Sequence, residues 1–250
     1  MDQRWSARTS QQLDTADTDT AALFRWPRED PGVTPNVIQR GMPARISVQA
    51  RYAAKLMPHL KAALYTSSMS RAETLKSERA YRIEPEARYT PQIGALAEMM
   101  NYARLTTLQA VEGLTTEQLD AVPEGFSNSI GMLLSHIAAV DWVYQMMSFE
   151  GRDIGEGDGA ILGGLTLGKE GTPPPTGQSL ETLLNELAAS RTLTLETFAA
   201  KDDGWLASRL PVPYDDMNQH WAWFHVMEDE FSHRGQIRLL RKHVAPGRKT

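Results

Sequence analysis

The sequence predicts an all-α protein, a four-helix bundle with one long crossover between its second and third helices. Three observations support this prediction. Apolar residues recur at helical spacing in four long stretches, and almost no stretch alternates as a β-strand does. The connection over residues 151–178 holds nine glycines and is much longer than the loops that join adjacent antiparallel helices. A chain of 250 residues that is 41% hydrophobic can build one such core.

The N-terminal region, residues 1–68, is predicted to be an extension that is disordered or partly helical. It is rich in polar residues and proline, and only residues 46–64 show a short helical pattern. Met57 and Met69 are candidate start codons of the natural protein, because the better-patterned part of the chain follows them. The helical bundle is expected over residues 69–250.

The first long helix is predicted from Pro91 to near Gly113, since Pro91 suits a first helical turn and apolar residues at helical spacing follow it. A second start signal at residues 115–118 predicts a short helical turn that closes at Pro123. The next long helix, over about 129–149, is apolar on more than half of its circumference. We therefore expect it to be mostly buried.

Two further long helices complete the predicted bundle. Residues 179–200 carry leucines at helical spacing, with Ser179 as the expected N-cap. The last helix, over about 219–242, has basic residues towards its C-terminus, where the helix dipole favours them. Between these helices, residues 201–218 are expected to hold turns and two short extended pieces, one of them around Leu206.

The chain contains no cysteine. This excludes disulfides, cysteine nucleophiles and metal sites built on thiolates. Any metal must therefore be held by His, Asp and Glu side chains.

The charge of the chain is uneven, with 14 basic and 10 acidic side chains in residues 1–88 but 12 basic and 21 acidic ones in residues 89–250. Such an acidic main body lacks the basic surface that binds phosphate backbones, so no nucleic-acid partner is expected. The most apolar stretch, residues 130–147, is interrupted by polar residues such as Asp141, and the first twenty residues lack an apolar segment. We expect no membrane span, no export signal and a cytoplasmic location.

Three polar side chains follow one another at intervals of four residues in the last helix: His225, Asp229 and His233. A step of four residues drifts only about 40° around a helix, so the three lie along one stripe. The Asp229–His233 pair has the spacing by which a helix presents two ligands to one metal. Taken alone, the same spacing also fits an acid and a histidine that form a hydrogen bond on the solvent-exposed surface of a helix.

His136 lies inside the most apolar predicted helix, where a histidine needs a partner. A backbone carbonyl or a carboxylate would satisfy it as an ordinary core residue. Alternatively it is a metal ligand, because four-helix bundles build metal sites from side chains on facing helices.

Two runs of the sequence resemble the DinB/YfiT-like superfamily of metal-dependent enzymes. The run 225–237 is similar to the last-helix signature H-V-x-x-H-E-x-x-H-R-G-Q-I, and the run 127–137 to the second helix with its single metal-binding histidine. The resemblance covers about residues 88–245. It implies an up-down-down-up four-helix bundle, a divalent metal, most often nickel or zinc, and a possible homodimer. The ligands that it implies are His136, Asp229 and His233.

The sequence departs from the common pattern at Asp229, where the superfamily usually has a histidine. A carboxylate is an acceptable zinc ligand, so a His-Asp-His set is chemically sound. Aspartate is a short side chain, however, so Glu230 is an alternative ligand, and loss of the metal is a third alternative.

The resemblance also suggests roles for the neighbours of the three ligands. His225 is expected to support a ligand or touch the substrate, or else to be a surface histidine packed near Trp221. Glu230, if it is not a ligand, is a further candidate for a supporting role. Apart from the resemblance, a purely structural interpretation expects Arg234 to pair with an acid such as Glu230, and Gly235 to permit a close approach of helices.

Three protein ligands leave metal positions open, which is typical of catalytic sites. Known relatives in the superfamily include S-transferases that use a low-molecular-weight thiol, bacillithiol or mycothiol. The implied function is therefore a metal-dependent enzyme, a thiol S-transferase or a hydrolase, acting on a small molecule with a thiol as cosubstrate. The 151–178 connection is expected at the mouth of its pocket. The alternative is a non-catalytic bundle in damage or stress response with a degenerate metal site.

Overall fold

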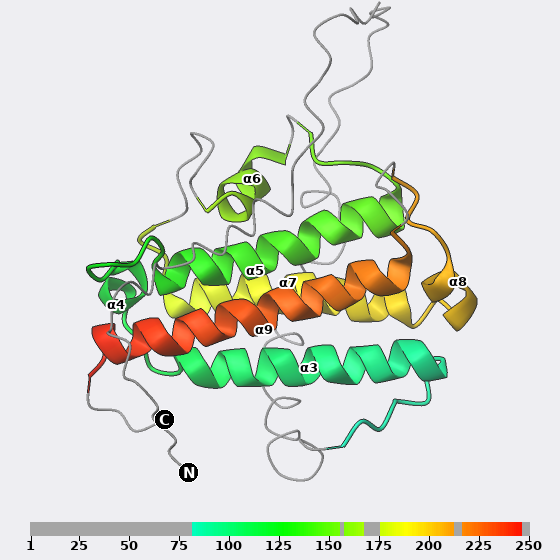
Figure 1. Ribbon diagram of the computed structural model, residues 1–250, viewed down its shortest axis with the longest axis horizontal. Coiled ribbons are helices and arrows are strands. Elements are labelled where there is room, and N and C mark those ends of the chain that lie inside the picture. The colour runs from blue at the N-terminus through cyan, green and yellow to red at the C-terminus, as the bar shows by residue number, and fades with distance from the viewer. Residues whose placement is uncertain (1–81, 156–157, 168–175, 213–216, 247–250) are drawn as a thin grey trace, which may run out of the picture. The chain divides into compact units, whose positions relative to one another are not determined.

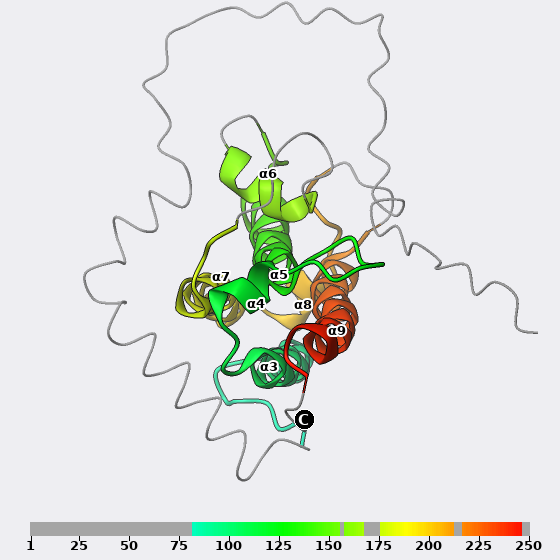
Figure 2. The ribbon, with the colours of Figure 1, turned by 90° about the vertical axis from the view of Figure 1, so that its left-hand side faces the viewer.

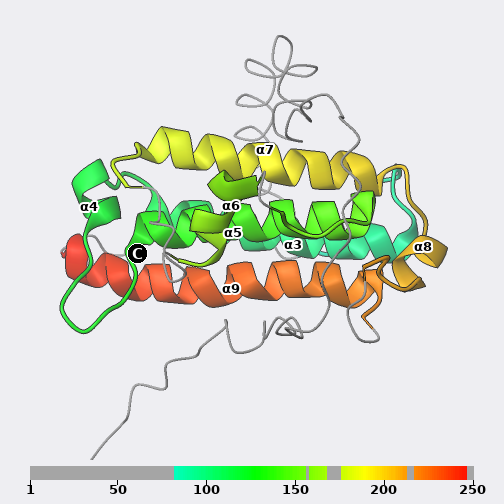
Figure 3. The same cartoon turned by 90° about the horizontal axis from the view of Figure 1, so that it is seen from above.

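Four long helices lie side by side (Figures 1 and 3) in the structure, a computed structural model that describes residues 82–155, 158–167, 176–212 and 217–246. They are α3 (Pro91–Val111), α5 (Ile130–Gln145), α7 (Leu180–Phe198) and α9 (Gln219–Val244). The colour gradient in Figure 1 shows that α5 and α7 run in one direction and α3 and α9 in the other. The predicted N-terminal extension, its short helix and the two candidate start methionines lie outside these ranges.

Seen end on, each long helix lies beside two of the others (Figure 2). α5 packs against α7 and α9, and α3 packs against α9 and α7. The all-α prediction is confirmed for the described part of the chain, which holds no strand; its one extended pairing is an isolated bridge between Arg209 and Asn218. No helix within these ranges is long and apolar enough to cross a membrane.

Three of the predicted helix starts carry side-chain caps, two of which, at Thr115 and Ser179, the sequence indicated. Thr115 and Gln118 form a reciprocal capping box at α4 (Thr116–Asp120). Ser129 accepts a hydrogen bond from the Met132 amide at the start of α5, and Ser179 caps α7 in the same way. Each cap satisfies an amide that the first helical turn leaves without a partner.

The extended piece predicted around Leu206 is wrong, because these residues form the short helix α8 (Asp203–Ala207). Asp202 caps it by accepting from the Trp205 amide at 2.7 Å. Leu206 is fully buried, and the Asp203 carboxylate reaches across to the start of α3. These contacts with the bundle, rather than local periodicity, stabilise a helix of only five residues.

The glycine-rich connection contains one element that the sequence did not predict. Helix α5 first continues as the π-helical turn η2 (Met146–Glu150) and ends at Gly151, whose φ of 63° is left-handed. The short helix α6 (Gly159–Leu165) then lies on the outer side of α5, away from α3 (Figure 2). Because α6, α7 and α9 all pack on α5, that helix is buried as predicted, and only Met132 and Trp142 along it are partly exposed.

Candidate metal centre

The structure brings together the three side chains proposed as ligands. His136 comes from the middle of α5, and Asp229 and His233 come from successive turns of α9. One ligand atom from each lies within 4.8 Å of the others, so the three can hold a metal ion. Their exposed fractions are 7%, 5% and 1% respectively. The alternative interpretation, in which Asp229 and His233 form a solvent-exposed hydrogen-bonded pair, is therefore wrong.

Asp229 lies between the two imidazole rings. Its Oδ1 is 3.5 Å from Nε2 of His136 and 3.3 Å from Nε2 of His233. The two rings meet edge to face, with their centroids 4.6 Å apart. The arrangement points two imidazole nitrogens and one carboxylate towards a common centre.

The outer nitrogen of each ring is already engaged by an oxygen atom. Nδ1 of His136 lies 3.1 Å from the Gly164 carbonyl oxygen, and Nδ1 of His233 lies 3.4 Å from Oε1 of Gln236. Carbonyl oxygens only accept hydrogen bonds, so each Nδ1 donates its proton. Each Nε2 is thereby directed to the centre, as is usual for histidines that bind metals.

The atoms left over at the centre fit a divalent cation. Oδ2 of Asp229 and Nε2 of His233 are buried and have no hydrogen-bond partner among the described residues. Buried polar atoms without partners are costly. Two imidazoles and a carboxylate are ligands that zinc and nickel accept.

The electrostatics of the centre also favour a positive charge. Burial opposes the charged form of His136, but the Asp229 carboxylate and the Gly164 carbonyl outweigh it and raise the pKa of the ring. Burial alone would raise the pKa of Asp229, whereas the two histidines hold it well below its usual range. The carboxylate therefore stays ionised in the interior.

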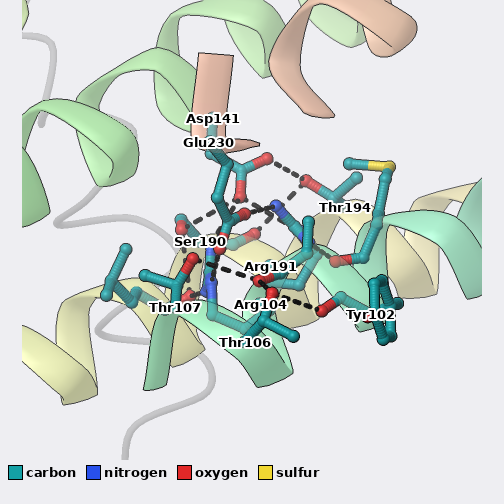
Figure 4. A network of polar contacts seen from close by, with 12 residues as sticks. Tyr102, Arg104, Thr106, Thr107, Asp141, Ser190, Arg191, Thr194 and Glu230 are labelled. Atoms are coloured by element: carbon teal, nitrogen blue, oxygen red, sulfur yellow. Dashed lines mark hydrogen bonds and ion pairs between the residues drawn. The ribbon is translucent and has the colours of Figure 1, made fainter. Parts of the chain in front are cut away.

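Glu230, the neighbour of Asp229, belongs to a separate buried cluster (Figure 4). We call it the ionic tetrad; each long helix contributes one member, namely Arg104 (α3), Asp141 (α5), Arg191 (α7) and Glu230 (α9). The two carboxylates are fully buried and the two arginines nearly so. Two positive and two negative charges balance one another within the tetrad.

The arginines of the tetrad bridge its two acids. Arg104 donates from Nε to Glu230 at 2.8 Å, and Arg191 donates to Glu230 at 2.8 Å and to Asp141 at 3.2 Å. Backbone carbonyls take further N–H groups, Leu187 from Arg104 and Met100 from Arg191. Burial would raise the pKa of Glu230, but both arginines lower it.

These contacts correct three expectations about the last helix. Glu230 is not an alternative metal ligand and does not support one, because both its oxygens face the tetrad arginines. Arg234 does not pair with Glu230; it donates to the Thr106 hydroxyl at 2.7 Å and lies over the Phe231 ring. Gly235 permits no close helix approach, since it is exposed and a Cβ there would meet nothing within 4 Å.

His225 lies outside the group of three ligands. Its ring stacks on Trp221 at 5.1 Å between centroids, and its Nδ1 is 3.1 Å from a carboxylate oxygen of Glu228. The expected packing near Trp221 is confirmed, although the His225 ring itself is buried. A contact between His225 and substrate stays a prediction.

Three residues near this centre could not be recognised from local sequence. Arg104 and Arg191 carry no local signal of their own; the one available signal is Asp141, an acid inside the most apolar helix, which needs a buried cation facing it. Gly164 lies in the glycine-rich connection and could not be told from its neighbours. Its importance arises only from the packing of α6 on α5.

Comparison with known families identifies the family to which the chain is similar. The sequence profile of a family described as mycothiol S-transferase matches residues 95–246. The match covers more than half of the chain and includes all three residues of the centre. Comparison with curated proteins gives no match.

Proposed function

The chain belongs to the mycothiol S-transferase family, which is of the DinB/YfiT-like type, and from this premise we propose that it is a divalent-metal-dependent thiol S-transferase. The observation that carries the proposal is the His136–Asp229–His233 group, with its ligand atoms within 4.8 Å of one another and two of its buried atoms unsatisfied. Zinc or nickel is the expected metal, because both accept a set of two imidazoles and one carboxylate.

A metal held by three protein ligands would keep open positions and lower the pKa of a thiol bound there. The chain's own part is to prepare this site. Gly164 and Gln236 fix the two imidazoles, and Asp229 provides negative charge in a buried setting. Packing by α5, α6 and α9 limits the access of water.

The proposed reaction joins a thiol to a small electrophile. The thiol loses its proton, its sulfur forms a bond to the electrophilic carbon, and the leaving group departs with the electrons of the bond that breaks. Since the chain has no cysteine, the sulfur must come from a cosubstrate. The family name favours mycothiol over bacillithiol as that cosubstrate.

We also propose that the fold is the up-down-down-up DinB/YfiT-like bundle. The helix directions in Figure 1 support this, together with the crossover between α5 and α7. The position of α6 on α5, beside His136, supports a role for the crossover at the mouth of the site. A homodimer stays a prediction, which analytical ultracentrifugation would test.

Metal analysis tests the centre. We would purify the protein without a metal-binding tag and measure zinc, nickel and manganese by elemental mass spectrometry in the parent, His136→Ala and Asp229→Ala. His243→Ala is the control, because His243 is an exposed histidine on the same helix. We expect near-stoichiometric metal in the parent and control and its loss in the other two. A parent without metal, even after reconstitution, would favour the non-catalytic binding module instead.

Thiol transfer tests the activity separately. The metal-loaded protein would be given an activated alkyl or aryl halide with mycothiol, bacillithiol or glutathione, and the thioether product would be followed by mass spectrometry. We expect product with mycothiol in the parent and none in His136→Ala. A metal-loaded protein that transfers none of these thiols would contradict the S-transferase assignment but not the metal centre.

A further inference from the structure

The geometry points to Gly164 as a positioning residue for the metal centre: its carbonyl keeps a proton on Nδ1 of His136 and so reserves Nε2 of that ring for the metal. This inference rests on the proposed function. It adds to the centre a backbone group from α6, which contributes none of the three ligands.

The carbonyl of Gly164 is free to accept this bond because of its place in α6. The last carbonyls of a helix have no partner within the helix, and Gly164 is the next-to-last residue. Its oxygen accepts from the Leu167 amide at 3.3 Å and lies 3.1 Å from Nδ1 of His136. The two lone pairs of a carbonyl oxygen can serve both donors.

A glycine is required at this position for α6 to come so close. A Cβ on Gly164 would lie 2.9 Å from the carbonyl oxygen of Ser135 and 3.1 Å from Cβ of Ala139. Both atoms belong to α5, on either side of His136 along the chain. Because the oxygen is part of the α5 backbone, α6 would have to move away, and its carbonyl would leave Nδ1.

Close packing could be the only role of Gly164, so the test must separate positioning from packing. Gly159 offers a matched control, because it lies in the same helix and a Cβ there would meet nothing within 4 Å. Gly159→Ala thus makes the same chemical change without moving α6.

The experiment compares Gly164→Ala and Gly159→Ala with the parent. Zinc affinity would be measured by competition with a chromophoric chelator, and the Nδ1–H proton of His136 would be observed by NMR in metal-free and zinc-loaded protein. Loss of a group that orients a metal-binding histidine typically costs 10- to 100-fold in affinity. We expect this loss, and loss of the protected Nδ1–H signal, in Gly164→Ala only.

A second variant guards against a general loss of stability. Adding Ala139→Gly to Gly164→Ala removes the 3.1 Å contact with the Ala139 side chain and leaves the closer one with the Ser135 backbone, although a glycine within a helix is itself destabilising. We expect this double variant to recover part of the zinc affinity while its unfolding temperature falls. A gain in zinc affinity that accompanies a lower unfolding temperature cannot be caused by a gain in stability.

The outcomes separate the inference from the proposed function. Parent-like zinc affinity in Gly164→Ala, or an equal loss in Gly159→Ala, would overturn the inference. A parent that binds neither zinc, nickel nor manganese would overturn the proposed function. Even then, the Nδ1–H signal of His136 in metal-free protein tests the contact with Gly164. The inference requires this signal to be present in the parent and absent in Gly164→Ala.

Discussion

Gln236 serves His233 as the Gly164 carbonyl serves His136. Its Oε1 lies 3.4 Å from Nδ1 of His233, one turn further along α9, while Nε2 of the ring faces the centre. A side-chain amide can be replaced by mutation, whereas a backbone carbonyl cannot. Gln236 therefore allows a direct test of how much this support contributes.

Replacing Gln236 with Leu, which is similar in size and cannot accept a hydrogen bond, should weaken zinc binding by about 10- to 100-fold, because the His233 ring loses the partner that fixes its orientation. Chelator competition measures the effect. Arg238→Leu, an exposed site half a turn away, should bind zinc as the parent does. Unchanged affinity in Gln236→Leu would show that the hydrogen bond does not orient the ring.

Two adjacent acids, Asp229 and Glu230, face different partners. Successive residues point about 100° apart on a helix, so Asp229 faces the histidines while Glu230 faces the arginines of the tetrad. Neither can replace the other without rotating α9. This is why the acid at position 229, and not the one at position 230, lies at the centre.

At the scale of single elements, α3 is capped by a residue that is remote in sequence. The Thr90 side chain does not cap the helix. Instead Asp203 of α8 accepts from the Thr90 hydroxyl and from the amides of Gln92 and Ile93, at 3.1 and 3.2 Å. The contact joins α8 to the start of the bundle.

This cap gives the stability a dependence on pH. The Thr90 hydroxyl and the two amides lower the pKa of Asp203 in the folded protein. Such a carboxyl stabilises the fold above its unfolded pKa of about 3.9, and this contribution is lost as the pH falls through the folded value. Asp203→Asn should therefore be less stable than the parent at neutral pH, by thermal unfolding. The difference should shrink below about pH 4; a constant difference would contradict it.

Two helical glycines should respond in opposite ways to alanine. Gly235→Ala places a methyl group in open space within α9 and should raise the free energy of unfolding by about 0.5–1 kcal/mol. In Gly94→Ala the new Cβ would lie 2.4 Å from Cβ of Pro85, so stability should fall. Urea unfolding measures both. A Cβ at Gly235 meets no atom of the chain within 4 Å. A destabilised Gly235→Ala would therefore indicate that this face of α9 contacts another molecule.

At the scale of the whole molecule, the ionic tetrad connects all four long helices. No single helix can satisfy its own charged member, because each partner is on another helix. Removing one member of a buried set leaves an uncompensated charge, which costs more than the intact set contributes. The tetrad therefore disfavours any other packing of the helices.

Arg191→Met should lower the free energy of unfolding by about 3–5 kcal/mol, because Asp141 and Glu230 would share only Arg104. Urea unfolding measures this change. Arg238→Met, which removes an exposed arginine, should change stability by no more than about 0.5 kcal/mol. A small effect of Arg191→Met would show that water or a rearranged Arg104 compensates the acids.

The sequence by itself determined the long helices and the candidate residues of the centre. Periodicity and side-chain caps act between residues at most a few positions apart, so the starts of α5 and α7 could be predicted locally. The spacing of Asp229 and His233 likewise predicted that these two side chains share one stripe of the last helix, and the resemblance to a known superfamily joined His136 to them.

Only the tertiary structure decided which partners the other polar groups have. Whether Glu230 faces a metal or Arg191 depends on the rotation of α9 against α7, which no local pattern encodes. The helices α6 and α8 are too short to form on their own, so contacts with α5 and α3 determine them. The role of Gly164 follows from the same cause, since a close approach of two backbones exists only once both helices are packed.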